Sequence, residues 1–158
     1  MSSHPQEYGN LFTIGWVRYL NLPHVILIEE VQSDVEAARR GLRDIRALRQ
    51  MGYSDQDAGA IDRELAFFQP YVDAFYYDAV GTIFEIADVE GKPVEMISHV
   101  QKEYVVKRDH GPDAKSPPKS VYEDLPKKMG MVKVQRSAVG DVSGPVWYYK
   151  PNRRRRRT

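Results

Sequence analysis

The stretch Pro23–Leu42, which reads PHVILIEEVQSDVEAARRGL, decides the fold that we predict for this chain. Its apolar run Val25–Ile28 predicts a buried strand over residues 24–32. Ser33 follows the strand and Glu36 stands three residues later, which is the capping-box spacing that begins a helix. Carboxylate, amide and hydroxyl groups therefore gather where a buried strand ends, and open α/β sheets commonly hold their binding sites at that position.

The composition is typical of a globular protein: 158 residues, of which 42% are hydrophobic and 28% charged. No apolar run approaches the roughly 20 residues of a membrane-spanning helix, and residues 1–10 lack the apolar segment of a signal peptide. The absence of cysteine excludes disulfides, Cys-bound zinc and thiol nucleophiles, and it fits a cytoplasmic protein. We expect a flexible arm over residues 1–10, a single α/β domain over 11–151 and a basic C-terminal tail over 152–158.

Helical spacing of apolar residues predicts three helices between the first strands and residue 91. The first runs on from Val35 to Leu48 and ends at Gly52. The second begins at Ser54, which has Asp57 three residues later, and Pro70 ends or bends it. The third covers residues 71–90, and Gly91 closes it.

Strand patterns lie on both sides of these helices. Residues 12–20 predict a strand that forms an antiparallel hairpin with strand 24–32, and residues 93–97 predict a strand parallel to 24–32. Residues 107–118 have a loop composition, and Ser116 before Pro117 predicts a short helix that ends by Gly130. Residues 131–136 and 146–149 predict a closing hairpin with its turn at 140–144. We therefore expect an α/β (α+β) fold: a mixed, largely antiparallel twisted sheet with helices on both faces.

Four polar residues are candidates for catalysis. Glu30 and Gln32 share one face of their strand, Ser33 follows them, and Tyr122 precedes the last strands. A desolvated Glu30 could act as a general base and Tyr122 as a proton donor. The alternative is structural: Ser33 caps the helix, Glu30 pairs with Arg18 across the hairpin, and Tyr122 belongs to the core.

The order of elements resembles that of the GNAT (Gcn5-related N-acetyltransferase) fold. There a hairpin leads into a splayed central strand, a long helix, a parallel strand, a short helix and a closing hairpin. The resemblance implies an acyl-CoA-dependent N-acyltransferase, with acetyl-CoA as cofactor and its pyrophosphate at a helix N-terminus. The segments closest to such a phosphate loop contain Gly52, Ser54 and Gly59, although the segment directly after strand 24–32 reads QSDVEA instead.

The motifs themselves resemble a domain of phages and mobile elements that occurs within large polyvalent proteins. The matching segments are Gly15–Tyr19 (GWVRY), Glu29–Asp34 (EEVQSD), Ala87–Gly91 (ADVEG) and Tyr122–Lys128 (YEDLPKK), in that order. Where the family usually has an aromatic residue after QSD, this chain has Val35. The resemblance implies a phage protein, located in the host cytoplasm or in the virion, and it implies no particular reaction.

The C-terminus carries five consecutive arginines, Arg153, Arg154, Arg155, Arg156 and Arg157. The whole chain has a formal charge of +1, so the chain without these five would carry −4. Such a tail suits nucleic acid, an acidic protein surface or simply solvent. The four histidines have no metal-binding spacing, so we expect no metal. A non-catalytic binding or virion-associated protein is therefore the alternative to an enzyme.

Overall fold

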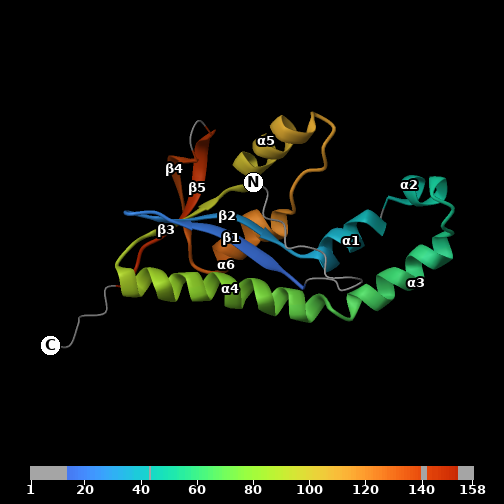
Figure 1. Cartoon of the computed structure of the whole chain (residues 1–158), viewed down its shortest axis with the longest axis horizontal. Coiled ribbons are helices and arrows are strands. Elements are labelled where there is room, and N and C mark those ends of the chain that lie inside the picture. Colours follow the sequence, from blue (N-terminus) through green and yellow to red (C-terminus); the bar gives the residue numbers. More distant parts are fainter. Residues whose placement is uncertain (1–13, 43, 140–141, 153–158) are drawn as a thin grey trace. The chain divides into compact units, whose positions relative to one another are not determined.

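The computed structural model describes residues 14–42, 44–139 and 142–152 (Figure 1). These residues divide between two compact units, 14–16 with 32–75 and 17–31 with 76–152. The range 11–151 that the sequence assigns to one domain is thus shared between these two units. The elements in chain order are β1 (Trp16–Asn21), β2 (Ile26–Gln32), α1 (Asp34–Leu42), α2 (Ile45–Gln50), α3 (Asp55–Ala66), α4 (Gln69–Glu90), β3 (Val94–Ile97), α5 (His99–His110), the π-helix η1 (Ser120–Asp124), α6 (Leu125–Lys128), β4 (Val132–Val139) and β5 (Val142–Tyr149).

The sheet has five strands in the described part of the chain, in the order β1-β2-β3-β5-β4. β2 and β3 are parallel, with Ile26 opposite Val94 and Ile28 opposite Met96. β5 is antiparallel to both β3 and β4. β1 and β2 are joined by residues 22–25 alone, which is too short for a parallel crossover, so this pair is antiparallel as well. The predicted mixed, mostly antiparallel sheet is confirmed.

The core of the second unit lies on this sheet. Ile26, Ile28, Val94, Met96 and Val146 have no exposed surface. Each comes from one of the three central strands, where a residue has strand neighbours on both sides and helices above or below. Burial of a side chain of this size contributes about 1.5–3 kcal/mol, so the centre of the sheet supplies much of the stability of this unit.

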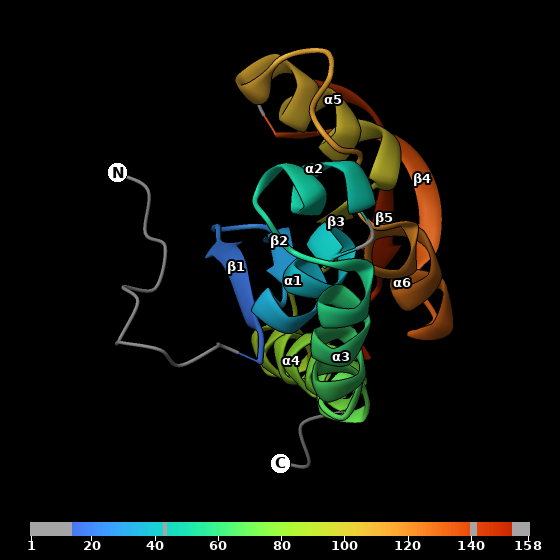
Figure 2. The same ribbon diagram turned by 90° about the vertical axis from the view of Figure 1, so that its right-hand side faces the viewer.

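Helices cover the sheet of the second unit on both of its faces. The part of α4 from Tyr76 onward and α5 lie on opposite sides of the strands in both views (Figures 1 and 2). On the α4 side, the ring of Phe84 stacks on Tyr149 with centroids 3.9 Å apart. The Tyr149 hydroxyl donates to Asp88 at 2.9 Å, and burial together with that carboxylate raises the pKa of Tyr149. These contacts fix α4 against β5.

The first unit contains α1, α2, α3 and the first turns of α4, and its helix starts follow from local side-chain caps. Ser33 accepts a hydrogen bond from the Glu36 amide, and Ser54 forms a reciprocal capping box with Asp57. Both caps confirm the predictions made from sequence spacing. Arg39 of α1 donates hydrogen bonds to Asp62 of α3 and Gln69 of α4, each at 2.9 Å, and the bond to the Asp62 carboxylate raises the pKa of Arg39.

Several of the sequence predictions are wrong in detail. The predicted continuous helix from Val35 to Leu48 is two helices, because Asp44 accepts a hydrogen bond from the Ala47 amide and starts α2 afresh. Residues 107–110 end a helix rather than begin a loop. Ser116 caps no helix, since its hydroxyl donates to Glu103 at 2.6 Å and the next helical segment begins only at Ser120.

Glycines end the helices where the sequence indicated. Gly52, Gly91 and Gly130 all have positive φ values, which place them in the left-handed region that favours glycine. Gly144 lies within β5 rather than in a turn, while Gly140 and Asp141 lie outside the described residues. The described helices include none that combines the length and apolar character needed to cross a membrane.

We predict that Ser98→Ala lowers the free energy of unfolding by about 1–2 kcal/mol, because Ser98 is fully buried and forms the capping box of α5 with Gln101. Urea denaturation followed by far-UV circular dichroism measures the change. Ser116→Ala is the matched control. It should cost under about 0.5 kcal/mol, because its hydroxyl is exposed and caps nothing. Equal losses for the two variants would contradict this assignment of the cap.

Candidate functional site

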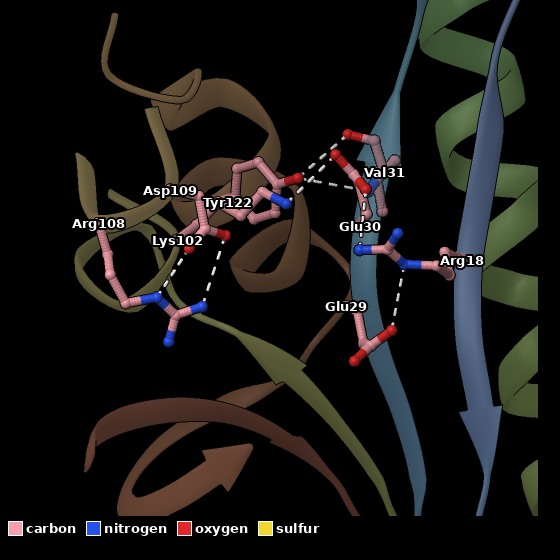
Figure 3. A network of polar contacts seen from close by, with 8 residues as sticks. All are labelled: Arg18, Glu29, Glu30, Val31, Lys102, Arg108, Asp109 and Tyr122. Carbon is pink, nitrogen blue, oxygen red and sulfur yellow. Dashed lines mark hydrogen bonds and ion pairs between the residues drawn. The ribbon is translucent and has the colours of Figure 1, made fainter. Parts of the chain in front are cut away.

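A cluster of charged side chains lies in the second unit where β2 runs beyond its pairing with β3. The Cα pairing of the two strands runs from Ile26 to Ile28, whereas β2 continues to Gln32. We use the name Glu30 cluster for the residues Arg18, Glu29, Glu30, Lys102 and Tyr122, which are drawn in Figure 3. They come from β1, β2, α5 and η1, so four elements meet at one point.

Glu30 is the centre of this cluster. One of its carboxylate oxygens lies 3.2 Å from the Lys102 ammonium, and the other lies 3.1 Å from the Arg18 guanidinium. The Glu30 and Lys102 side chains are 16% and 11% exposed, so this pair is largely shielded from solvent. Arg18 also reaches Glu29 at 3.1 Å through its Nε atom. Two carboxylates and two cations therefore balance one another.

Tyr122 is the residue that η1 contributes to the cluster. The residue is 2% exposed, and its hydroxyl lies 3.4 Å from both the amide nitrogen and the carbonyl oxygen of Val31 (Figure 3). The Lys102 ammonium lies 5.9 Å from the ring centroid, within the range of a cation–π contact. The Tyr122 carbonyl accepts a 2.8 Å hydrogen bond from the Trp147 indole. Tyr122 thus links β2 to β5 through contacts at both ends of the residue.

The predicted catalytic residues fall into two groups. Glu30 and Tyr122 meet in the second unit, with Lys102 between them. Gln32 ends β2 and Ser33 caps α1, and both belong to the first unit. The structural alternative is observed for three of the four: Ser33 is a cap, Glu30 pairs with Arg18, and Tyr122 is a core residue.

The ion pairs of the cluster fix the position of the Glu30 carboxylate. A general base must come within about 2.6–3.2 Å of the proton that it removes. Both oxygens of Glu30 already face cations, so a substrate would have to displace or join Lys102 or Arg18. Next to the cluster, Arg108 bonds Asp109 at 2.8 Å and lowers the pKa of that carboxyl (Figure 3).

The residues predicted to bind a cofactor lie at the start of α3 in the first unit. Gly52 precedes the helix, Ser54 caps it, and Gly59 is within it. The Ser54 amide and hydroxyl both bond the Asp57 carboxylate, at 3.1 and 2.5 Å. Asp55 adds a second carboxylate to the same turn. These acids stand where a pyrophosphate would have to approach the helix, and they would repel it.

Sequence reasoning missed Lys102 because it missed helix α5. The signal was present as the spacing of Ser98 and Gln101, which form a capping box with both reciprocal hydrogen bonds. The tail residues Arg153–Arg157 lie outside the described residues. Among the residues that the structure describes, no group of three or more histidine and acidic side chains is placed to hold a metal ion.

The motif segments quoted from the sequence contribute most of the Glu30 cluster. Arg18 comes from the first segment, Glu29 and Glu30 from the second, and Tyr122 from the fourth, whereas Lys102 lies outside all of them. Comparison with models of known protein families, with curated proteins and with solved structures finds no match for this chain.

We predict that Glu30→Ala destabilises the protein by about 2 kcal/mol, because it leaves the shielded Lys102 charge without this partner. The neighbouring Glu29→Ala is the control. It should cost under about 1 kcal/mol, since its partner Arg18 is 45% exposed and the pair is screened by water. Urea denaturation of the two variants measures the difference. The double variant Lys102→Met/Glu30→Ala tests the coupling. If its loss of unfolding free energy equalled the sum of the losses in the two single variants, the proposed coupling would be absent.

Proposed function

We propose that this chain is a phage-type protein that binds nucleic acid through its C-terminal part. One observation carries the proposal: charge is strongly divided along the chain. Residues 98–158 contain 15 Lys and Arg against 6 Asp and Glu, a formal charge of +9, whereas residues 1–97 contain 8 against 16, a charge of −8. A concentration of positive charge in one part of a protein is the electrostatic signature of phosphate binding.

Exposed lysines support this assignment. Seven of those between residue 98 and the tail are exposed in the second unit, namely Lys107, Lys115, Lys119, Lys127, Lys128, Lys133 and Lys150. Lysines and arginines that contact phosphates release condensed counterions, and this release provides affinity without reading base sequence. The five arginines of the tail would add to the same electrostatic contribution to affinity. The proposal is therefore binding to the nucleic-acid backbone rather than recognition of a particular sequence.

The Glu30 cluster supports a binding function over catalysis. Its cations and carboxylates are paired with one another, and Tyr122 is held by the backbone of Val31. These contacts suit a rigid scaffold that carries a basic surface. The resemblance of the motif segments to the phage and mobile-element domain supports a phage origin.

We predict that deletion of Arg153–Arg157 lowers the salt dependence of DNA binding. The slope of log K against log salt should fall by up to about four or five units, because each phosphate contact contributes about 0.9 to the slope on duplex DNA. Fluorescence anisotropy of a labelled duplex at several salt concentrations measures the slope. Replacement of the five arginines by lysine should retain most of it, whereas replacement by serine should act like the deletion.

An unchanged slope after the deletion would show that the tail does not contact the phosphates. In that case Lys127→Gln with Lys128→Gln tests the folded part, since both side chains are exposed. Absence of DNA and RNA binding by the intact chain at low salt would overturn the proposal as a whole.

An acyl-CoA-dependent N-acyltransferase is the second candidate. The observation that favours it is the parallel β2–β3 pair, because β2 extends past the paired residues and carries Glu30 there. The resemblance to the acetyltransferase order of elements would place a thioester between two diverging strands. Glu30 would then accept the amine proton, and Tyr122 would act as proton donor.

Calorimetry with acetyl-CoA tests this second candidate. An acyltransferase should bind acetyl-CoA with micromolar affinity, and Glu30→Gln should reduce turnover more than it reduces binding because it removes the base and retains the shape. Glu29→Gln is the control and should leave both unchanged. A protein that binds DNA and shows no heat with acetyl-CoA would exclude the acyltransferase and leave the first proposal standing.

A further inference from the structure

Helix α5 has an unusual solvent face. Val100 and Tyr104 are 59% and 57% exposed, and Lys107 and Arg108 continue the same stripe at the next turn. These positions follow one another at helical spacing, so the four side chains lie on one face. An apolar residue, an aromatic ring and two cations therefore share a surface of the second unit.

The polarity of α5 is reversed relative to an ordinary surface helix. His99 and Gln101 are buried on the inner side, whereas Val100 and Tyr104 face solvent. Within the described ranges the Tyr104 ring stacks on no other ring and its hydroxyl makes no hydrogen bond. Internal packing thus does not account for an aromatic ring at this position.

The helix that carries this face is held at both ends. The capping box of Ser98 and Gln101 fixes its start, and Gly111 ends it with a bond from its amide to the Lys107 carbonyl at 2.9 Å. His99 bonds the Pro117 carbonyl at 2.9 Å, which ties the following loop back to the helix. Tyr104 therefore projects from a fixed support, and little ordering would be required when a flat ligand binds.

Two cations lie on the turn that follows Tyr104, and each pairs with a nearby carboxylate. Lys107 pairs with Glu103 at 3.0 Å, and Arg108 pairs with Asp109 at 2.8 Å. Both cations are 45% exposed, so water screens these pairs and a phosphate can compete for them. In the sequence, this helix belongs to the segment 98–158, which carries the +9 charge described above.

We propose that Tyr104 is the stacking platform for an unpaired base of single-stranded nucleic acid, with Lys107 and Arg108 contacting the adjacent phosphates. This inference rests on the proposed function and specifies its substrate class. Proteins that bind single strands combine cationic side chains along the backbone with aromatic rings on which bases stack. A duplex offers no unpaired base to Tyr104, so the ring distinguishes single strands from duplexes.

Fluorescence anisotropy with labelled oligo-deoxythymidine and oligo-uridine of about 15 nucleotides tests the inference on the full chain. Tyr104→Ala should weaken binding of at least one of the two strands by about fivefold or more, because one stacking contact is lost. Tyr104→Phe should bind like the original protein, since the ring and not the hydroxyl makes the contact. The strand with the larger loss identifies DNA or RNA as the preferred ligand.

Tyr77→Ala is the matched control: Tyr77 is 39% exposed on α4, a helix with five acidic residues and no basic ones, and its loss should leave binding unchanged.

A duplex of the same length should bind Tyr104→Ala and the original protein equally. If Tyr104→Ala binds both single strands normally while deletion of Arg153–Arg157 weakens them, the platform is excluded and the proposed function stands. Equal losses on single strands and duplex would also overturn the stacking role. Absence of binding by the intact chain would overturn the proposed function itself.

Discussion

The parallel pairing of β2 with β3 is the constraint on which the rest of the structure depends. Parallel neighbours cannot be joined by a tight turn, so the chain must leave the sheet at Gln32 and return at Val94. The connection contains α1 to α4, and it includes residues 33–75 of the first unit. The remaining strands are added by antiparallel pairing around this central pair. One strand pairing therefore determines the topology of the sheet and requires the long connection that forms most of the first unit.

The same pairing determines where charge can be held. β2 is longer than β3, and the additional residues have no β3 residue opposite them. Side chains from α5 and η1 meet β2 at this point, which allows Lys102 and Tyr122 to reach Glu30 and Val31. A shielded carboxylate requires a nearby cation, and the cluster provides two. Two cations therefore face two carboxylates, and the cluster carries no net charge.

Elements with a strong local signal were predictable from the sequence. The apolar run before Glu29 predicted β2, and the spacing from Ser33 and Ser54 predicted two helix starts. Helix α5 was not predicted because it lacks the usual apolar stripe, since it buries His99 and Gln101 and exposes Val100. The break before α2 depends on one hydrogen bond that the Asp44 side chain accepts from the Ala47 amide, and the apolar spacing of the sequence gives no sign of it. In the candidate site, the sequence predicted the pairing of Glu30 with Arg18 and the core position of Tyr122 as the structural alternative to catalysis. It did not predict Lys102, because the contact of Lys102 with Glu30 spans distant elements.

The position of β4 has a consequence for self-association. Among the described strands β4 is an edge of the sheet, and its outer backbone groups are open to pairing with another chain. Lys133 of this strand pairs with Glu123 at 2.6 Å and lies 4.7 Å above the Trp147 ring, so a charge is fixed beside the edge. A lysine on an edge strand disfavours the addition of a further strand, because docking would desolvate the ammonium. The Lys133–Glu123 pair thus disfavours edge-to-edge association of the sheet at β4.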